Sequence, residues 1–153
     1  MRKSTILVLF ALTIAGLVAR AWAGPAEEVA QIAGPRGQAF EQGNAEAYSA
    51  AFADNAVLTS SLSAYRIEGK EAIQAYFVQL FQLYPGRRLF TRQPVIRAYG
   101  DNLVIQNAYN VLYVTDQGGK VTQLTLRSSV VWTKGGGRWQ IVDQHVSRIP
   151  MMH

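Results

Sequence analysis

Three side chains near the end of the chain have the chemistry of acid–base or nucleophilic catalysis. Asp143, His145 and Ser147 follow one another at intervals of two residues. In a β-strand such residues share one face, so the carboxylate and the imidazole can touch. A catalytic triad also needs a serine activated by the histidine and an oxyanion-binding site, and no neighbouring motif supplies either. A satisfied polar network is therefore the favoured interpretation.

Asp54 and Tyr109 join His145 as candidates for acid–base catalysis. Asp54 lies at a predicted junction between a helix and a strand, where an aspartate is more often a turn residue than a catalytic one. Proton transfer needs a group of tuned pKa within reach of the substrate, and the sequence assigns that role to none of the three. Asp143 and His145 alone are not a metal-ligand set, and the other histidine, His153, is the last residue. We therefore expect no metal and no cofactor, and we favour a protein without catalysis.

Helical segments come first among the elements that must position these side chains. Apolar spacing predicts a helix from Pro25, which Gly34-Pro35 should kink or split. Phe40 resumes its apolar face before Gly43-Asn44 breaks the chain again. Tyr48 and Phe52 are four residues apart and should meet on the inner face of the next helix. The remaining early segments are short strands over 56–60 and 64–68 and an amphipathic helix over 73–84.

Long β segments make up the second half of the chain. Glycine-containing turns separate four of them, over 87–99, 102–115, 119–133 and 138–148. Pro94 should mark a bulge or an edge, because proline cannot donate a hydrogen bond to the ladder. Helices followed by an antiparallel meander predict an α+β domain with the helices packed on one face of a curved sheet.

Alternation along these strands divides their residues between two faces. The more apolar set, expected to face the helices, contains Val104, Gln106, Ala108, Asn110, Leu112, Leu124, Leu126, Ser128, Val130, Val142, Gln144 and Val146. The more polar, tyrosine-rich set contains Ile105, Asn107, Tyr109, Val111, Tyr113, Thr125, Arg127, Ser129, Val131, Ile141, Asp143, His145 and Ser147. A single β-bulge would reverse this assignment.

The predicted cleft between helices and sheet combines aliphatic walls with convergent amides, as small-ligand sites do. The expected pocket residues are Tyr48, Phe52, Tyr76, Gln106, Asn110, Ser128 and Gln144, with Tyr65 and Phe77 closing the pocket from the helical side. The opposite face of the sheet is expected to form a dimer interface through Tyr109, Arg127, Asp143, His145 and Ser147.

The first 23 residues are typical of a secretory signal. Arg2 and Lys3 precede an apolar run over 6–19, and an Ala-Trp-Ala cleavage site follows. We predict cleavage after Ala23, which leaves a single secreted or periplasmic domain over 24–153. The alternative is an uncleaved membrane anchor, but the apolar run is shorter than the ~20 residues that span a bilayer.

Composition narrows the classes of partner. The signal carries three basic and no acidic residues, so its removal lowers the formal net charge from +5 to +2. Nucleic-acid binding needs a concentrated basic footprint, which is missing, so we expect no nucleic-acid partner. The chain has no cysteine, which excludes disulfides, thiolate metal sites and a lipid anchor at the cleavage point.

Three stretches resemble the nuclear transport factor 2-like superfamily, namely Phe52–Leu58, Glu68–Ile73 and Gly135–Pro150. Within that superfamily, the chain resembles most the SnoaL-like and SgcJ/EcaC-type bacterial group. That group is similar to the association domain of calcium/calmodulin-dependent protein kinase II. The resemblance covers residues 26–150, and no kinase domain fits in the chain.

This resemblance implies a cystatin-like, cone-shaped α+β fold, in which a curved antiparallel sheet wraps around N-terminal helices, and a homodimer. Relatives include enzymes and plain binding modules, so the fold does not set the function. The pocket arginines of the kinase association domain correspond here to Asn110, Val130 and Val146, and the paired-histidine, paired-serine ending reads Gln144–Ser147. These departures weigh against transferring the carboxylate-binding role of that pocket.

Three functional hypotheses remain open. The favoured one is an exported, homodimeric module that binds a small ligand or a partner without catalysis and keeps no membrane anchor. The second is a SnoaL-like isomerase, cyclase or hydrolase acting on a small hydrophobic substrate in the pocket. The third is an export-associated or immunity-type protein whose sheet face caps another protein.

Overall fold

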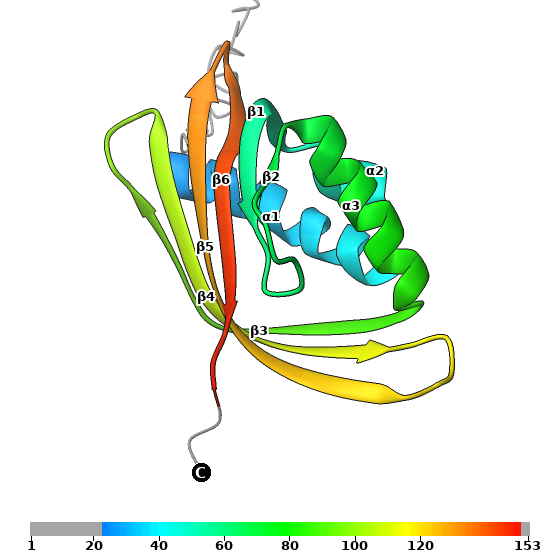
Figure 1. Cartoon of the computed structure of the whole chain (residues 1–153). Coiled ribbons are helices and arrows are strands. Elements are labelled where there is room, and N and C mark those ends of the chain that lie inside the picture. Colours follow the sequence, from blue (N-terminus) through cyan, green and yellow to red (C-terminus); the bar gives the residue numbers. More distant parts are fainter. Residues whose placement is uncertain (1–22, 151–153) are drawn as a thin grey trace, which may run out of the picture.

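The computed structural model describes residues 23–150, so residues 1–22 of the predicted signal over 1–23 and the terminal His153 lie outside the described residues. Three helices pack on one side of a curved, unclosed six-stranded sheet (Figure 1). The elements are α1 (Pro25–Gln42), α2 (Ala45–Ser49), β1 (Phe52–Thr59), β2 (Ile67–Glu68), α3 (Lys70–Leu83), β3 (Gly86–Ala98), β4 (Leu103–Thr115), β5 (Val121–Gly135) and β6 (Arg138–Arg148). The predicted α+β class is confirmed.

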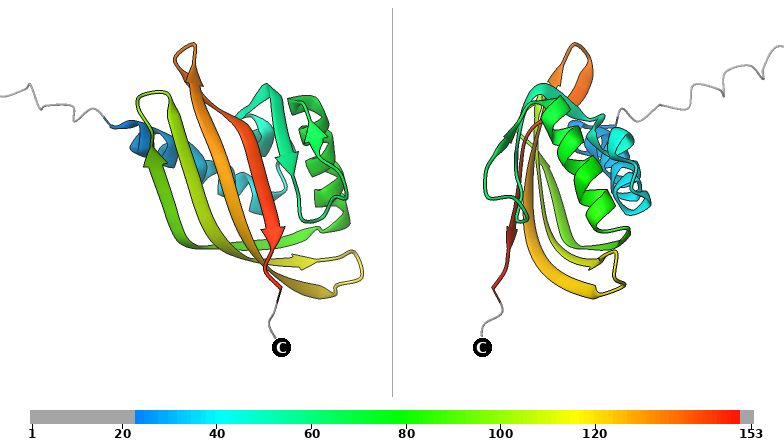
Figure 2. Two further views of the ribbon diagram at one scale, coloured as in Figure 1. Left: turned by 60° about the vertical axis from the view of Figure 1, so that its left-hand side comes forward. Right: turned by 45° about the vertical axis from the view of Figure 1, so that its right-hand side comes forward.

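The sheet has the order β2-β1-β6-β5-β4-β3. The meander from β3 to β6 is antiparallel, as predicted, whereas β1 runs parallel to β6. β3 is an edge strand, and its register shifts between Arg92 and Val95, around Pro94. The prediction of a bulge or edge at Pro94 is therefore confirmed. The long strands bend along their length, so the sheet curves around α1 and α3 (Figure 2).

α1 is one continuous helix through Pro35, so the prediction that Gly34-Pro35 could split it is wrong. Proline removes the hydrogen bond to the carbonyl of residue i−4, here that of Gln31. Gln31, Gly34 and Pro35 are all exposed, so water can satisfy that carbonyl. α1 ends instead at Gln42 and is capped by Gly43. Gly43 has a left-handed φ of 73°, which glycine adopts without strain, and its N–H donates to the carbonyl of Phe40.

Phe52 begins β1 rather than extending the helix that carries Tyr48, so the predicted helical pairing of these two residues is wrong. α2 is short and starts at Asn44, whose side chain accepts a hydrogen bond from the N–H of Ala47 at 2.9 Å. Phe52 is fully buried because it pairs with Ile141 of β6. The two rings still lie near each other, with 6.4 Å between their centroids.

Alternation places the inner and outer faces of the sheet as predicted, with one exception. Val104, Asn110 and Leu126 are buried, whereas Asp143 and His145 are exposed. Ile141, predicted on the outer face, is fully buried. A shift in the β5–β6 register explains this exception: Val131 pairs with Asp143, but Trp132 pairs with Ile141. Because of this bulge, the side chains of β6 before Asp143 lie on the opposite face from the one that simple alternation predicts, whereas those from Asp143 onward lie on the predicted face.

Arg87 ties the C-terminal ends of α1 and α3 to β3. Its guanidinium donates hydrogen bonds to backbone carbonyls at both helix ends: Phe40 at 3.0 Å, Phe81 at 3.2 Å, Glu41 at 3.5 Å, and Tyr84. The last carbonyls of a helix have no partner within it, so Arg87 acts as a shared cap, together with the N–H of Gly43, which also donates to the Phe40 carbonyl. Burial lowers the pKa of Arg87, but a guanidinium remains charged in proteins.

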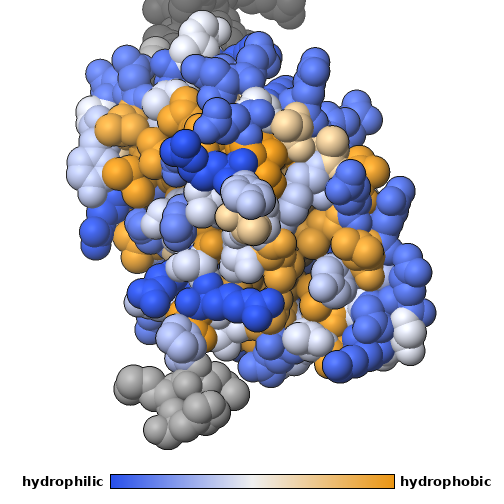
Figure 3. Space-filling model, in the orientation of Figure 1, coloured by the Kyte–Doolittle hydropathy of each residue, from blue (hydrophilic) through white to orange (hydrophobic). Residues whose placement is uncertain are grey.

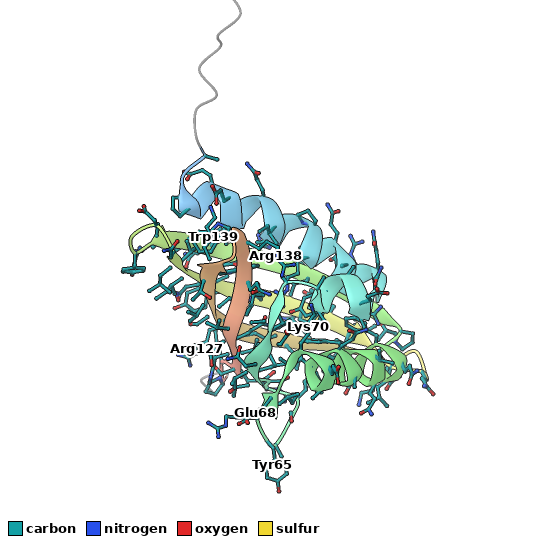
Figure 4. The ribbon with its side chains drawn as sticks, turned by 90° about the horizontal axis from the view of Figure 1, so that it is seen from above. Tyr65, Glu68, Lys70, Arg127, Arg138 and Trp139 are labelled. Atoms are coloured by element: carbon teal, nitrogen blue, oxygen red, sulfur yellow. The ribbon has the colours of Figure 1, made fainter. Side chains whose placement is uncertain are left out.

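Glu28 fastens the start of α1 to the β5–β6 hairpin. Its Oε2 accepts hydrogen bonds from Lys134 Nζ and Trp139 Nε1, each at 2.6 Å. Both donors favour the charged carboxylate and lower the pKa of Glu28 below its ordinary value. Trp139 and Arg138 lie at the hairpin beside the first turn of α1 (Figure 4).

Glu28 should make stability depend on pH in acid. Its pKa is lower in the folded protein than in the unfolded chain, so its contribution is present above the unfolded pKa and is lost as the pH falls through the folded pKa. Urea unfolding at several pH values should show wild type more stable than Glu28→Gln near neutrality, with the difference shrinking from about pH 6 to about pH 3. A difference that stays constant over this range would show that the pKa of Glu28 is not lowered by folding.

Candidate functional site: a cavity between helices and sheet

A cavity of about 150 Å³ lies between the inner face of the sheet and the helices. Apolar side chains supply most of its wall: Ala33, Phe40, Leu58, Leu62, Phe77, Leu80, Leu89, Ala108, Leu112, Leu126, Val130 and Val146. The aromatic members belong to a cluster of edge-to-face rings, in which the centroids of Tyr48 and Phe77 are 4.4 Å apart. An apolar wall of this kind favours a ligand with an apolar body.

Three side chains form a hydrogen-bonded chain at one end of this cavity, and we call them the polar end: Arg36, Gln144 and Tyr48. Arg36 of α1 donates from Nη2 to Gln144 Oε1 at 2.7 Å and from Nε to the carbonyl of Tyr48 at 3.1 Å. Gln144 of β6 donates in turn from Nε2 to the Tyr48 hydroxyl at 3.2 Å. The guanidinium carbon also lies 3.8 Å from the centroid of the Tyr48 ring, a cation–π contact.

Arg36 is a cation without an acidic partner among the residues at 23–150. The salt bridges in this part of the chain are Arg66–Glu68 and Lys134–Glu28, and neither involves Arg36. Burial lowers the pKa of Arg36, because the surroundings disfavour the charged form. The side chain remains a guanidinium cation nevertheless.

Two smaller polar groups line the sheet side of the cavity. Asn110 Nδ2 donates to Ser128 Oγ at 3.0 Å, and Gln106 Oε1 accepts from Trp132 Nε1 at 3.2 Å. An indole nitrogen can only donate, so the oxygen of Gln106 faces Trp132. Its amide NH₂ group is then left to donate elsewhere.

The cavity brings together Tyr48, Gln106, Asn110, Ser128 and Gln144 from the predicted pocket, and also Phe77. Phe52 and Tyr76 do not belong to its lining. The Tyr76 hydroxyl instead lies 2.6 Å from the hydroxyl of Ser60, and burial raises the pKa of Tyr76. Tyr65, expected to help close the pocket, is 84% exposed and projects from the tip of the β1–β2 loop (Figure 4).

The candidate catalytic residues lie outside the cavity lining. Asp54 is exposed on β1, within the strand rather than at its junction with a helix, and His145 is exposed on β6. Tyr109 is half exposed on the outer face of β4, where it is directly opposite Arg127 of β5. Among residues 23–150, no hydrogen bond joins Asp143 to His145, and no three acidic or histidine side chains cluster as a metal site would require.

Sequence reasoning missed Arg36, although a signal for it was present. Val29, Ala33, Arg36 and Phe40 are spaced by four, three and four residues, so they share one face of an uninterrupted α-helix. A basic residue in line with three apolar ones on the buried face of α1 marks a charge held near the core. The expected interruption at Pro35 hid this spacing.

The family model of the calcium/calmodulin-dependent protein kinase II association domain matches residues 25–150. The chain belongs to this association-domain family. The resemblance to the nuclear transport factor 2-like superfamily is thereby confirmed, together with its fold. A search of curated proteins found no significant match. Within residues 23–150, no helix of this association domain is long and apolar enough to cross a membrane.

Solved structures similar to this association domain share its fold at low sequence identity. A Xanthomonas campestris protein assigned to the same association domain has a TM-score of 0.74 and 24% identity, over 84% of this chain and 91% of its own. A nuclear transport factor 2-like protein of unknown function from Pseudomonas putida KT2440 has a TM-score of 0.72 and 22% identity, over 82% and 87%. A Streptomyces avermitilis protein assigned as a dehydratase of the nuclear transport factor 2-like family has a TM-score of 0.72 and 12% identity, over 82% and 97%.

Proposed function

We propose that this association-domain protein is an exported, homodimeric module that binds a small, largely apolar molecule in its cavity without transforming it. The observation that carries the proposal is the cavity itself, with aliphatic and aromatic walls and a few polar groups gathered from α1, β4, β5 and β6. Its volume of about 150 Å³ is comparable to apolar cavities that bind a single ring such as benzene.

The same lining favours binding over catalysis. Among the described residues, those that line the cavity include no aspartate, glutamate or histidine. Isomerases, cyclases and hydrolases need a general base within hydrogen-bond reach of the substrate. Asp54 and His145 would have to act from outside the cavity, so the SnoaL-like enzyme alternative lacks a positioned base.

Export and dimerisation are parts of the proposal that rest on separate observations. The residues over 1–23 have the pattern of a cleavable signal. The outer face of the sheet exposes Tyr109 and Phe90, at 50% and 43%, between polar neighbours. Figure 3 shows hydrophobic side chains interspersed with hydrophilic ones over the visible face of the molecule. A mixed surface with exposed aromatic residues is typical of a subunit interface.

Filling the cavity should abolish ligand binding while leaving the fold intact. Ala108 lies on the inner face of β4 and lines the cavity, so Ala108→Leu places three additional carbon atoms in the empty space. We expect titration calorimetry to show that wild type binds hexanamide, a neutral molecule with a short apolar tail. The variant should bind at least about tenfold more weakly, because the ligand would overlap the new side chain.

The matched control is Ala98→Leu, which adds the same atoms at an exposed position on the edge strand β3. It should bind hexanamide as wild type does. Thermal unfolding should show that Ala108→Leu is as stable as wild type or more so, because the cavity is filled. Equal binding by wild type and a folded Ala108→Leu variant would place the ligand elsewhere and contradict the proposal.

A further inference from the structure

We infer that the ligand of this cavity carries an anionic oxygen head, such as a carboxylate, that binds at the polar end formed by Arg36, Gln144 and Tyr48, with its apolar tail along the sheet. This inference rests on the proposed function and names the chemical class of the ligand. It uses an arginine from α1, a different element from the strands that would carry the arginines implied by the family resemblance, where Asn110, Val130 and Val146 stand instead.

Arg36 brings a positive charge to the wall of the cavity. Arg36 lines the cavity, and its guanidinium contacts a glutamine, a backbone carbonyl and aromatic rings, with no carboxylate in salt-bridge range among residues 23–150. A charge removed from water is costly unless an opposite charge pairs with it. Neutral partners offset only part of this cost, so an anion entering the cavity would meet a cation that is already partly desolvated.

The hydrogen bonds within the polar end each run in one direction, which determines the donors that remain. A guanidinium can only donate, so Gln144 must present its oxygen to Arg36 and its NH₂ group to Tyr48. The Tyr48 oxygen therefore accepts from Gln144, and its own proton is left for another acceptor. Arg36 uses Nε and one Nη2 hydrogen in these bonds, which leaves its other N–H groups. The polar end thus offers several unused N–H and O–H donors, which match the acceptor-only oxygens of a carboxylate.

The rest of the cavity wall is largely apolar and indicates an apolar body for the ligand. Leu112, Leu126 and Val130 line the sheet side, and the sheet-side amide of Gln106 is a further donor. A compact inorganic anion would leave these apolar walls without contacts. A carboxylate with a short alkyl or aryl tail places its head at Arg36 and its tail against the wall, so both regions are satisfied.

The test compares hexanoate with hexanamide, which has the same tail and a neutral head. Titration calorimetry at neutral pH and low salt should show that wild type binds hexanoate at least about tenfold more tightly, because charge-assisted hydrogen bonds are stronger than neutral ones. Arg36→Gln should remove this preference and retain hexanamide binding within about twofold. Arg138→Gln, which alters an exposed arginine at the β5–β6 hairpin, should leave the preference unchanged.

Gln144→Glu is a second variant, which tests the inference independently of whether Arg36→Gln folds. The new carboxylate would lie beside Arg36 in place of the amide oxygen, now 2.7 Å from Nη2, and would supply the counter-charge from within the protein. We expect this variant to fold, to bind hexanamide and to lose its preference for hexanoate. Hexanamide bound as tightly as hexanoate by wild type, or an unchanged preference in folded Gln144→Glu, would overturn the inference and leave the proposed function standing. Failure of wild type to bind either molecule would overturn both.

Discussion

Replacing Arg87 with methionine should lower the free energy of unfolding by about 3 kcal/mol, because several buried carbonyls at the ends of α1 and α3 would lose their donor together. Methionine keeps most of the aliphatic volume but donates no hydrogen bond. The carbonyls of Phe81 and Tyr84 have no helical N–H to accept from, and that of Phe40 would keep only the N–H of Gly43. The packing around Arg87 shields these carbonyls from water. Urea unfolding followed by far-ultraviolet circular dichroism would measure the loss.

Arg88→Met is the matched control for this experiment, since Arg88 is the next residue of β3 and is exposed. Its effect should stay within about 0.5 kcal/mol, as is usual for surface substitutions. Equal effects of the two substitutions would mean that Arg87 is not the cap that holds the helix ends together. A large loss of stability for Arg87→Met alone would also show that Arg87 holds α1 and α3 in place over the sheet.

Tyr109→Asp should convert the proposed dimer into a monomer. Tyr109 lies midway along β4 on the outer face of the sheet, and a two-fold interface at this point would bring both copies of the new carboxylate into the contact. Burying a charge without a partner in the other subunit is costly. We expect dimerisation to weaken by at least about 100-fold, which light scattering coupled to gel filtration would detect over a range of concentrations.

The fold of each subunit should survive this change. Arg127 stands directly opposite residue 109 on β5, so the new aspartate gains a cross-strand partner of opposite charge. Tyr99→Asp is the control, because Tyr99 is also half exposed but lies at the β3–β4 turn, beyond the end of β3. A wild-type protein that is monomeric at every concentration would contradict the dimer proposal and favour the hypothesis that the sheet caps a different protein.

Several strands and helices could be predicted from the sequence because their apolar residues recur at fixed intervals. The alternation of faces along β4 and β5 assigned Asn110, Ser128 and Val130 to the inner face. The structure confirms this, because Asn110 and Val130 are buried and Ser128 lines the cavity. The spacing of apolar residues likewise predicted α3, where Ile73, Phe77 and Leu80 are buried. Each of these patterns reflects one buried face of one element, so the local sequence is sufficient to predict it.

The departures arise where tertiary contacts decide the outcome. Pro35 lies on the exposed side of α1, so the helix continues through a residue that would normally end it. Phe52 joins a strand because β6 lies beside it, a partner about ninety residues away in sequence. The bulge that buries Ile141 depends on the pairing of β5 with β6. Arg36 became visible as a site residue only after α1 was known to be unbroken.

The central claim is that the cavity is the ligand site, and intermolecular nuclear Overhauser effects test it most directly. With methyl-labelled protein and hexanoate, we predict cross-peaks from the ligand tail to the methyl groups of Ala108, Leu126 and Val130 on the inner face. Contacts only to Val95 or Val121, which are exposed on β3 and β5, would place the ligand on the surface and contradict the account.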